Sequence, residues 1–167
     1  MSRFLIHPRL RSGALAVCGL ALAAAGTLAV AAPSASSAPT ASSAIAQRQA
    51  NFKDMGKAMK LLKEQISSGS PDKTLTVAAA KTIAAKARLQ GGLFPPGSGS
   101  SAGVKTDALD ELWFKRPVFD GQMAQLVASA DKLVGAASSG NADALAAQFT
   151  ETGKACGACH RQFRADD

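Results

Sequence analysis

The sequence comprises 167 residues, of which 19 are Lys or Arg and 12 are Asp or Glu, with three cysteines and two histidines. This length fits one domain plus a short targeting segment. The basic residues are spread along the chain and form no cluster, so the positive charge gives no nucleic-acid-binding signature and we expect no nucleic-acid partner.

Residues 1–31 have the features of a secretory signal peptide. Three arginines lie near the start, and an uncharged run rich in Ala and Leu follows. Ala29-Val30-Ala31 fits a leader-peptidase site with cleavage before Ala32, and later cleavage after Ala38 or Ala44 would also fit. No two arginines are adjacent, which favours the Sec route of export to the periplasm over the twin-arginine route.

An uncleaved membrane anchor is the alternative interpretation, because the apolar run approaches the roughly 20 residues that span a bilayer. The run is only weakly hydrophobic and a cleavage site follows it, so we expect no stable membrane anchor in the mature protein. Cleavage would remove Cys18, His7 and three arginines. It would leave 16 of the 19 basic residues against 12 acidic ones, with two cysteines and one histidine.

Residues 32–43 contain only Ala, Ser, Pro and Thr. Such a composition cannot bury a core, so we predict a flexible leader here. The folded domain is then expected over residues 44–167.

The first predicted helix spans residues 43–67. Apolar side chains recur there at helical spacing, while lysines lie mostly on the other side. The apolar positions are Ile45, Phe52, Met55, Met59, Leu62 and Ile66. The run Ser68-Gly69-Ser70-Pro71 ends the helix.

The second predicted helix spans residues 71–90, with Asp72 as its N-cap. One face is marked by Leu75, Ala79, Ile83 and Ala87. Gly91-Gly92 ends this helix, and a long loop then runs to Lys105. A loop of this length usually has a function or is mobile.

The third helical region spans residues 107–139, with a short turn first and then a helix that starts near Pro117, a residue suited to a first helical turn. Gly140 ends it, and Asn141 caps a fourth helix over residues 142–164. The apolar positions of the third helix are Phe119, Met123, Leu126, Ala130, Leu133 and Ala137. In the fourth helix, one stripe holds Leu145, Phe149, Thr152, Cys156 and His160.

No segment alternates like a β-strand, and helices joined by short connections pack antiparallel to their neighbours. The sequence therefore predicts an all-α fold, an antiparallel four-helix bundle with one longer crossover loop.

Small residues dominate the apolar stripes, so the core looks thin for the chain length. A large apolar cofactor inside the bundle would fill that gap.

The run Cys156-Gly157-Ala158-Cys159-His160 is the attachment signature of c-type haem. Cysteines three residues apart project from the same face of a helix, where each thiol can add across one vinyl group of the porphyrin. The histidine that follows is placed to bind the iron axially. We predict one covalent haem c near one end of the bundle, attached through Cys156 and Cys159, with His160 as the metal ligand.

Three other interpretations of this run fit less well. A closed zinc site needs about four protein ligands, and the mature chain would offer only two cysteines and one histidine. A thioredoxin-like redox pair would need a βαβ context, which the sequence lacks. A single disulfide is compatible with export but would leave His160 without a role.

The placement of the motif on the last helix of a four-helix bundle resembles the class II c-type cytochromes, and among them the cytochrome c′ family. The resemblance covers nearly the whole mature chain. It rests on Arg48-Gln49-Ala50-Asn51-Phe52, on Leu93-Phe94-Pro95-Pro96-Gly97, on Trp113, and on Thr152-Gly153-Lys154-Ala155-Cys156 through Arg164.

The resemblance implies roles for three further residues. The family has an arginine near the start of the first helix that pairs with a haem propionate, and here it would be Arg48. One turn later, the position that is a ligating methionine in low-spin relatives is Phe52. Arg164 matches a basic position near the proximal face of the haem. The alternatives are a solvated surface role for Arg48 and a helix-dipole role for Arg164.

Phe52 decides the expected chemistry, because phenylalanine has no lone pair to donate. Iron held only by His160 would be five-coordinate and high-spin, and an apolar distal wall favours nitric oxide and carbon monoxide over dioxygen. The alternative is a low-spin electron carrier with Met55 as the sixth ligand, although a methionine in such a stripe is more often core filling. Trp113 and Phe119 are interpreted as core or haem packing.

The resemblance thus implies a periplasmic haem protein that binds small gases and exchanges one electron with a redox partner protein. We do not expect an enzyme and name no catalytic residue, because His160 is the only mature histidine and no acid–base pair is available to cleave an O–O bond. Relatives are often homodimers that pack through their first two helices. The lysine-lined outer face of the first helix gives no clear apolar patch for such a dimer.

Overall fold

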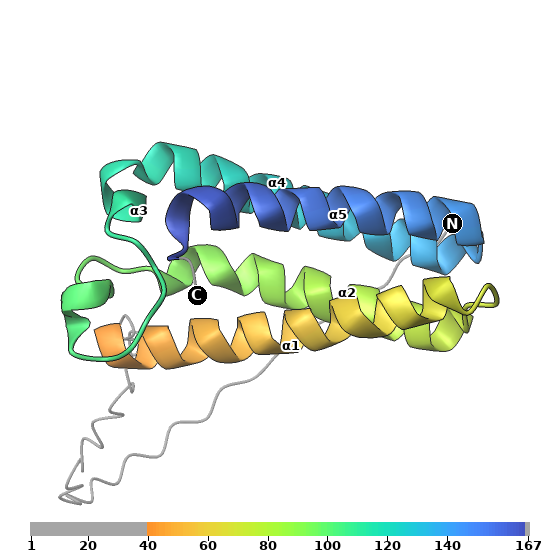
Figure 1. The fold of residues 1–167 in the computed structure, drawn as a ribbon, viewed down its shortest axis with the longest axis horizontal. Coiled ribbons are helices and arrows are strands. Elements are labelled where there is room, and N and C mark those ends of the chain that lie inside the picture. The colour runs from red at the N-terminus through yellow and green to blue at the C-terminus, as the bar shows by residue number, and fades with distance from the viewer. Residues whose placement is uncertain (1–39, 166–167) are drawn as a thin grey trace, which may run out of the picture. The chain divides into compact units, whose positions relative to one another are not determined.

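A computed structural model describes residues 40–165, which are largely helical (Figure 1). The four long helices of this part of the chain are α1 (Ala41–Ser67), α2 (Lys73–Gln90), α4 (Arg116–Ser139) and α5 (Ala142–Phe163). Three short helices lie between α2 and α4, namely η1 (Gly91–Leu93), η2 (Ser100–Ala102) and α3 (Glu111–Phe114). The predicted signal peptide over residues 1–31 and most of the predicted leader lie outside the described residues.

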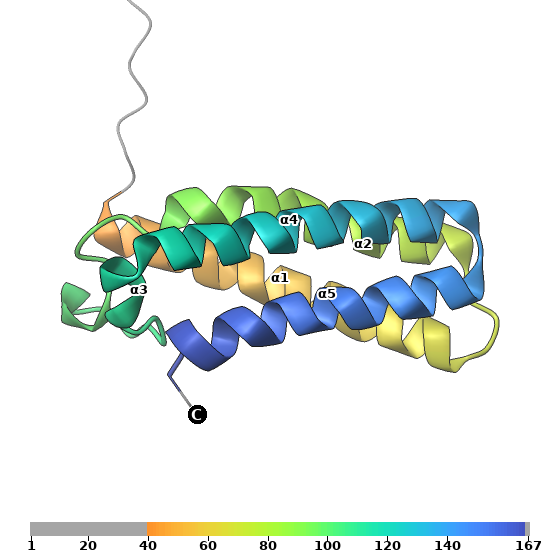
Figure 2. The ribbon, with the colours of Figure 1, turned by 90° about the horizontal axis from the view of Figure 1, so that it is seen from above.

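The long helices alternate in direction and form a four-helix bundle, as Figures 1 and 2 show. Consecutive helices pack against each other in turn, α1 on α2, α2 on α4 and α4 on α5, whereas α1 and α5 contact each other much less. The predicted all-α antiparallel bundle is therefore confirmed. Within residues 40–165, no helix is both long enough and apolar enough to cross a membrane.

The capping residues set the helix ends where the sequence predicts them. Asp72 accepts a hydrogen bond through Oδ1 from the backbone N–H of Leu75 at 2.9 Å, and Asn141 does the same for Ala144 at 2.9 Å. Gly140 ends α4 with a φ of 74°, a left-handed conformation that glycine adopts without a Cβ clash. The tight connection that results places α5 beside α4.

Two details differ from the sequence prediction. Helix α1 begins at Ala41, because the side chain of Thr40 accepts a hydrogen bond from the N–H of Ser43, so the end of the predicted leader is helical. On α2, Leu75 is 44% exposed and Thr76 is buried. Thr76 can be buried because its hydroxyl donates to the Asp72 carbonyl at 2.9 Å and is not left unsatisfied.

The core is built largely from small and medium-sized residues, as the thin apolar stripes predict. Helix α2 contributes mainly alanines and Ile83. Helix α4 buries all six predicted positions, Phe119, Met123, Leu126, Ala130, Leu133 and Ala137. The alanines on the buried face of α2 let it pack against α4. The volume that larger side chains would fill lies at one end of the bundle.

Candidate functional site

A cavity of about 540 Å³ lies within the bundle, at the end where the loop between α2 and α4 covers it. This volume is in the range of roughly 300–1,000 Å³ that cofactor and small-molecule sites occupy. Its wall is mainly apolar and includes Phe52, Met55, Met59, Ile83, Phe94, Leu112, Phe119, Met123, Leu126 and Phe163. This cavity takes up the volume that larger core side chains would otherwise fill, which explains the small size of the core residues.

The three residues of the attachment signature line this cavity from α5. Cys156 and Cys159 are partly buried free thiols and form no disulfide with each other. Burial raises the pKa of both thiols, and for Cys159, where the charge of Cys156 adds to the effect, it raises the pKa to about 11. Both side chains are therefore protonated thiols at neutral pH.

His160 lies at the exposed edge of the same cavity. Partial burial and the positive charge of Arg164 lower the pKa of its imidazole. The neutral ring is the form that binds a metal through a nitrogen lone pair.

This set of donors fits a haem. Two thiols one helical turn apart match two vinyl groups, a single neutral imidazole matches one axial iron position, and the aromatic, aliphatic and thioether wall matches the porphyrin faces. Cys156, Cys159 and His160 would hold the group, and a bound haem would supply an iron centre for ligand binding and one-electron chemistry.

From the other side, α1 contributes Phe52, which is partly buried and lines the cavity, and Met55, which is 5% exposed and lines it too. The predicted distal residue and its competitor therefore both face the space next to His160. Two further methionines, Met59 and Met123, also line the cavity. Periodicity placed these side chains on apolar stripes, and the family resemblance pointed to the Phe52 face of the first helix as the one next to the haem.

Arg48 is 2% exposed, so it is not a solvated surface residue. Its Nη1 atom donates to the carbonyl of Leu93 at 3.3 Å and to Ser98 Oγ at 2.8 Å, and its Nη2 atom donates to the carbonyl of Ser98 and to Thr106 Oγ1, both at 2.6 Å. The guanidinium also lies over the Phe94 ring, 4.6 Å from its centroid.

These neutral partners leave the charge of Arg48 uncompensated. Among the described residues, no carboxylate forms an ion pair with it. A buried cation without a counter-ion is costly, and Arg48 lines the cavity. The site therefore offers a positive charge suited to an acidic group of a cofactor.

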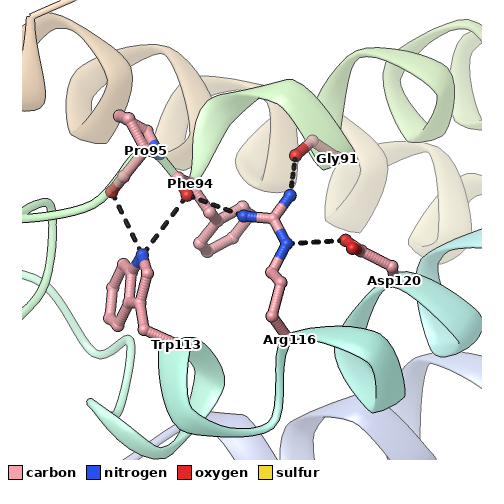
Figure 3. Close-up of polar contacts among 6 residues, drawn as sticks. All are labelled: Gly91, Phe94, Pro95, Trp113, Arg116 and Asp120. Atoms are coloured by element: carbon pink, nitrogen blue, oxygen red, sulfur yellow. Dashed lines mark hydrogen bonds and ion pairs between the residues drawn. The ribbon is translucent and has the colours of Figure 1, made fainter.

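Arg116 and Trp113 hold the loop that follows α2, as Figure 3 shows. Phe94 of this loop lines the cavity. The guanidinium of Arg116 donates to the carbonyl oxygens of Phe94 at 3.0 Å and Gly91 at 3.2 Å, and to Asp120 Oδ1 at 2.8 Å. Trp113 Nε1 donates to the carbonyls of Phe94 at 3.3 Å and Pro95 at 3.1 Å.

This clamp fixes an aromatic cluster beside the haem cavity. The Phe94 ring meets Phe119 edge-on with centroids 4.8 Å apart, and Phe119 meets Phe163 in the same way at 5.6 Å. The prediction of haem or core packing is confirmed for both residues as core packing: Phe119 is buried and lines the cavity, and Trp113 is partly buried and packs against the core without lining the cavity. The role of Arg116 was not predicted from the sequence, because its position next to Pro117 was its only distinguishing feature there.

Arg164 lines the cavity beside His160. Its backbone forms an isolated antiparallel bridge with Ala108. In this bridge the N–H of Leu109 donates to the carbonyl of Phe163 at 3.0 Å, and the N–H of Ala165 donates to the carbonyl of Asp107 at 2.8 Å. The end of α5 is thereby pinned to the segment before α3, which closes the cavity at this end.

A four-helix bundle with a haem-attachment signature on its last helix, facing an apolar cavity, defines a helical-bundle c-type cytochrome. A sequence model of the Cytochrome C' family matches residues 43–164. The chain belongs to the cytochrome c′ family, whose members bind haem c covalently, and its Cys156 and Cys159 stand at the attachment motif.

Individual relatives agree with this assignment. The cytochrome c' of Allochromatium vinosum is 35% identical over 124 residues, which are 72% of this chain and 79% of that protein. The cytochrome c' of Rhodocyclus tenuis is 33% identical over 129 residues, 74% of this chain and 94% of that protein. The crystal structure of cytochrome c' from Thermochromatium tepidum superposes with a TM-score of 0.73 at 32% identity, covering 78% of this chain and all of that one (100%).

Proposed function

We propose that this protein is a periplasmic cytochrome with one haem c whose iron is bound by His160 on one side and left open on the side of Phe52. It binds nitric oxide and carbon monoxide at the open position and takes part in one-electron transfer. The observation that carries the proposal is that Phe52, which has no lone pair, lines the cavity from α1 while His160 lines it from α5. That pairing supports five-coordinate iron, because Phe52 has no lone pair to donate.

Arg48 would pair with a haem propionate. Its buried, uncompensated charge supports this role, because a carboxylate would supply the missing counter-ion. The four hydrogen bonds to the loop leave the Nε–H for a further acceptor. Arg48 would then join the haem to the loop wall through one guanidinium.

Arg164 would act on the proximal side. Burial lowers the pKa of His160, and the charge of Arg164 adds to this effect, which favours the neutral, metal-binding form of the ring.

The second candidate is a low-spin electron carrier in which Met55 is the sixth ligand. It is favoured by one observation, the burial of Met55 in the wall of the same cavity. A thioether at the sixth position would block gas binding and leave electron transfer as the function.

The absorption spectrum of the purified protein decides between the two. The ferric and then the ferrous protein are measured before and after addition of carbon monoxide. A broad high-spin Soret band that sharpens and shifts with carbon monoxide supports the open site. A sharp low-spin spectrum that carbon monoxide does not change would reject it, and conversion of that spectrum to high-spin by Met55→Leu would identify the sixth ligand.

Nitric oxide buffering or detoxification is the physiological role we propose. Two structures with the same fold, at 24% identity, are nitric oxide complexes of variants of cytochrome c prime from Alcaligenes xylosoxidans. The support in this chain is the apolar Phe52 wall. A strain that lacks the protein yet tolerates nitric oxide as well as its parent would contradict this role.

Export and assembly complete the proposal. The signal over residues 1–31 would direct the chain to the periplasm, where its haem would be attached, and N-terminal sequencing of the secreted protein tests the cleavage site.

A cytochrome c' that is 30% identical is described with a ligand-controlled dimer dissociation. A homodimer through α1 and α2 would cover Leu75 and Leu89, which are 44% and 57% exposed on α2, and sedimentation with and without carbon monoxide tests it.

A further inference from the structure

The wall that α1 presents to the cavity has one position without a side chain. The residues that line the cavity from this helix are Arg48, Gln49, Phe52, Met55, Gly56 and Met59. Gly56 is exposed, whereas Phe52 and Met59 are partly buried and Met55 is buried. A Cβ atom added at Gly56 would meet no heavy atom within 4 Å. The α1 edge of the cavity is therefore open at Gly56.

The surroundings place this opening at the seam between α1 and α5. Two turns before Gly56, the side chain of Gln49 donates from Nε2 to the carbonyl of Lys105 at 2.9 Å, which ties α1 to the loop before α3 at that point. On the facing helix, the exposed residues His160 and Arg164 line the cavity. Helices α1 and α5 contact each other less than the other adjacent helices do. Gly56 itself is exposed, lines the cavity and has no neighbouring atom within 4 Å of an added Cβ.

Backbone geometry and close packing give no reason for glycine at this position. Gly56 is not among the glycines with a positive φ, and no neighbouring atom occupies the place of a side chain. A glycine inside a helix weakens it relative to alanine. What the missing side chain does provide is access to the cavity.

We propose that Gly56 is the specificity-determining position that sets the size of the ligand able to reach the Phe52 side of the site. The inference rests on the proposed function, in which small gases bind on that side. Gly56 follows Phe52 by one helical turn, so the two lie on the same side of α1. A ligand that enters through the seam passes Gly56 before it reaches Phe52.

The test compares Gly56→Ala and Gly56→Leu with Gly121→Leu in the haem-loaded protein. Gly121 is a matched control, because it is also an exposed helical glycine with no heavy atom within 4 Å of an added Cβ, and it does not line the cavity. Association rates of carbon monoxide and of a bulkier alkyl isocyanide with the ferrous protein are measured by rapid mixing. The equilibrium affinities and the melting temperatures are measured on the same samples.

We expect Gly56→Leu to slow isocyanide association on the order of 10-fold, the scale at which a pocket excludes extra methylene groups, and to slow carbon monoxide less. Gly56→Ala should slow the association of both ligands less than Gly56→Leu does, again with the larger effect on the isocyanide. Gly121→Leu should slow neither ligand. The equilibrium affinity for carbon monoxide should not change, because a gate slows entry and exit equally. Both leucine variants should melt at or above the wild-type temperature, since each replaces a helical glycine.

Unchanged association rates in Gly56→Leu, or the same slowing in Gly121→Leu, would overturn the assignment of Gly56 and leave gas binding intact. A loss of carbon monoxide affinity at an unchanged association rate would also overturn it, because the substitution would then act on the bound ligand. A wild-type ferrous protein that binds neither ligand would overturn the proposed function and this inference together.

Discussion

Arg48 illustrates how much one buried side chain can organise. Its two terminal nitrogens contact acceptors on Leu93, Ser98 and Thr106, which lie 45 to 58 residues away in the sequence. Burial lowers the pKa of the guanidinium, but a group with so high an ordinary pKa stays charged at neutral pH. The same cation thus holds the loop and supplies charge to the cavity.

Replacement of Arg48 by Met should destabilise the protein by about 2–4 kcal/mol, because buried acceptors on the loop lose their donor. The free energy of unfolding is measured by urea titration. Arg88→Met is the control, since Arg88 pairs with Asp131 where both side chains are about half exposed, and such a pair contributes about 0–1 kcal/mol. Equal losses in the two variants would contradict the structural role of Arg48.

Replacement of Phe52 by Met should place a thioether in the cavity and give a low-spin spectrum with weakened carbon monoxide binding. Phe52→Leu supplies a side chain of similar polarity without a lone pair and should remain high-spin. Ferric absorption spectra of both variants check this. A high-spin Phe52→Met protein would mean that position 52 does not face the iron.

At the scale of elements, the connection from Gly91 to Asp110 behaves as part of the site. Arg48 holds it from α1, and Arg116 and Trp113 hold it from the other side (Figure 3). Phe94, which sits between these anchors, faces both Arg48 and Phe119. The loop is therefore a fixed wall rather than a flexible linker.

Replacement of Arg116 by Met should lower stability by about 1–3 kcal/mol and speed amide exchange in residues 91–98, because the carbonyls of Gly91 and Phe94 lose a donor. Urea titration and hydrogen exchange measure the two effects. Asp120→Asn keeps both loop contacts and removes only an exposed pair within α4, which contributes about 0.3–0.5 kcal/mol. Faster loop exchange in Asp120→Asn as well would argue against the clamp.

The helices could be predicted and the clamp could not, for one physical reason. Periodicity and caps such as Asp72 and Asn141 act over three or four residues, so the sequence displays them directly. The bond from Arg116 to Gly91 joins positions 25 residues apart, and no local pattern marks it. The attachment cysteines and His160 were found because haem chemistry demands a fixed spacing, whereas the cavity walls depend on how the helices pack.

On the scale of the whole molecule, the haem and the bundle are expected to stabilise each other. In the haem-free chain, the side chains that line this cavity of about 540 Å³ would lack van der Waals contacts on the side that faces it. A group fixed to α5 that fills this space would tie α1, α4 and the loop to the same centre. The free energy of unfolding should therefore be much larger for the haem-loaded than for the haem-free chain.

The haem-free chain should lose stability as the pH rises above about 9. Unfolded Cys159 would ionise near its ordinary pKa of 9.0, whereas burial raises the pKa in the folded chain to about 11, so the folded state binds more protons in this interval. The haem-loaded protein should lack this alkaline loss, because thioether sulfurs carry no proton. Melting temperatures between pH 8 and pH 11, roughly, measure both forms, and an equal loss in the two would mean that Cys159 is not attached.

The weak contact between α1 and α5 also has a consequence for how the chain assembles. The other contacts between the long helices join α1 with α2, α2 with α4 and α4 with α5, and the two helices of each of these pairs lie closer in the sequence than α1 and α5 do. The seam between α1 and α5 joins the two ends of the domain and has the largest loop-closure entropy of these contacts, so we expect it to form last during folding. A haem attached to Cys156 and Cys159 would lie between these two helices, so we expect α5 to receive its cofactor before α1 packs over it.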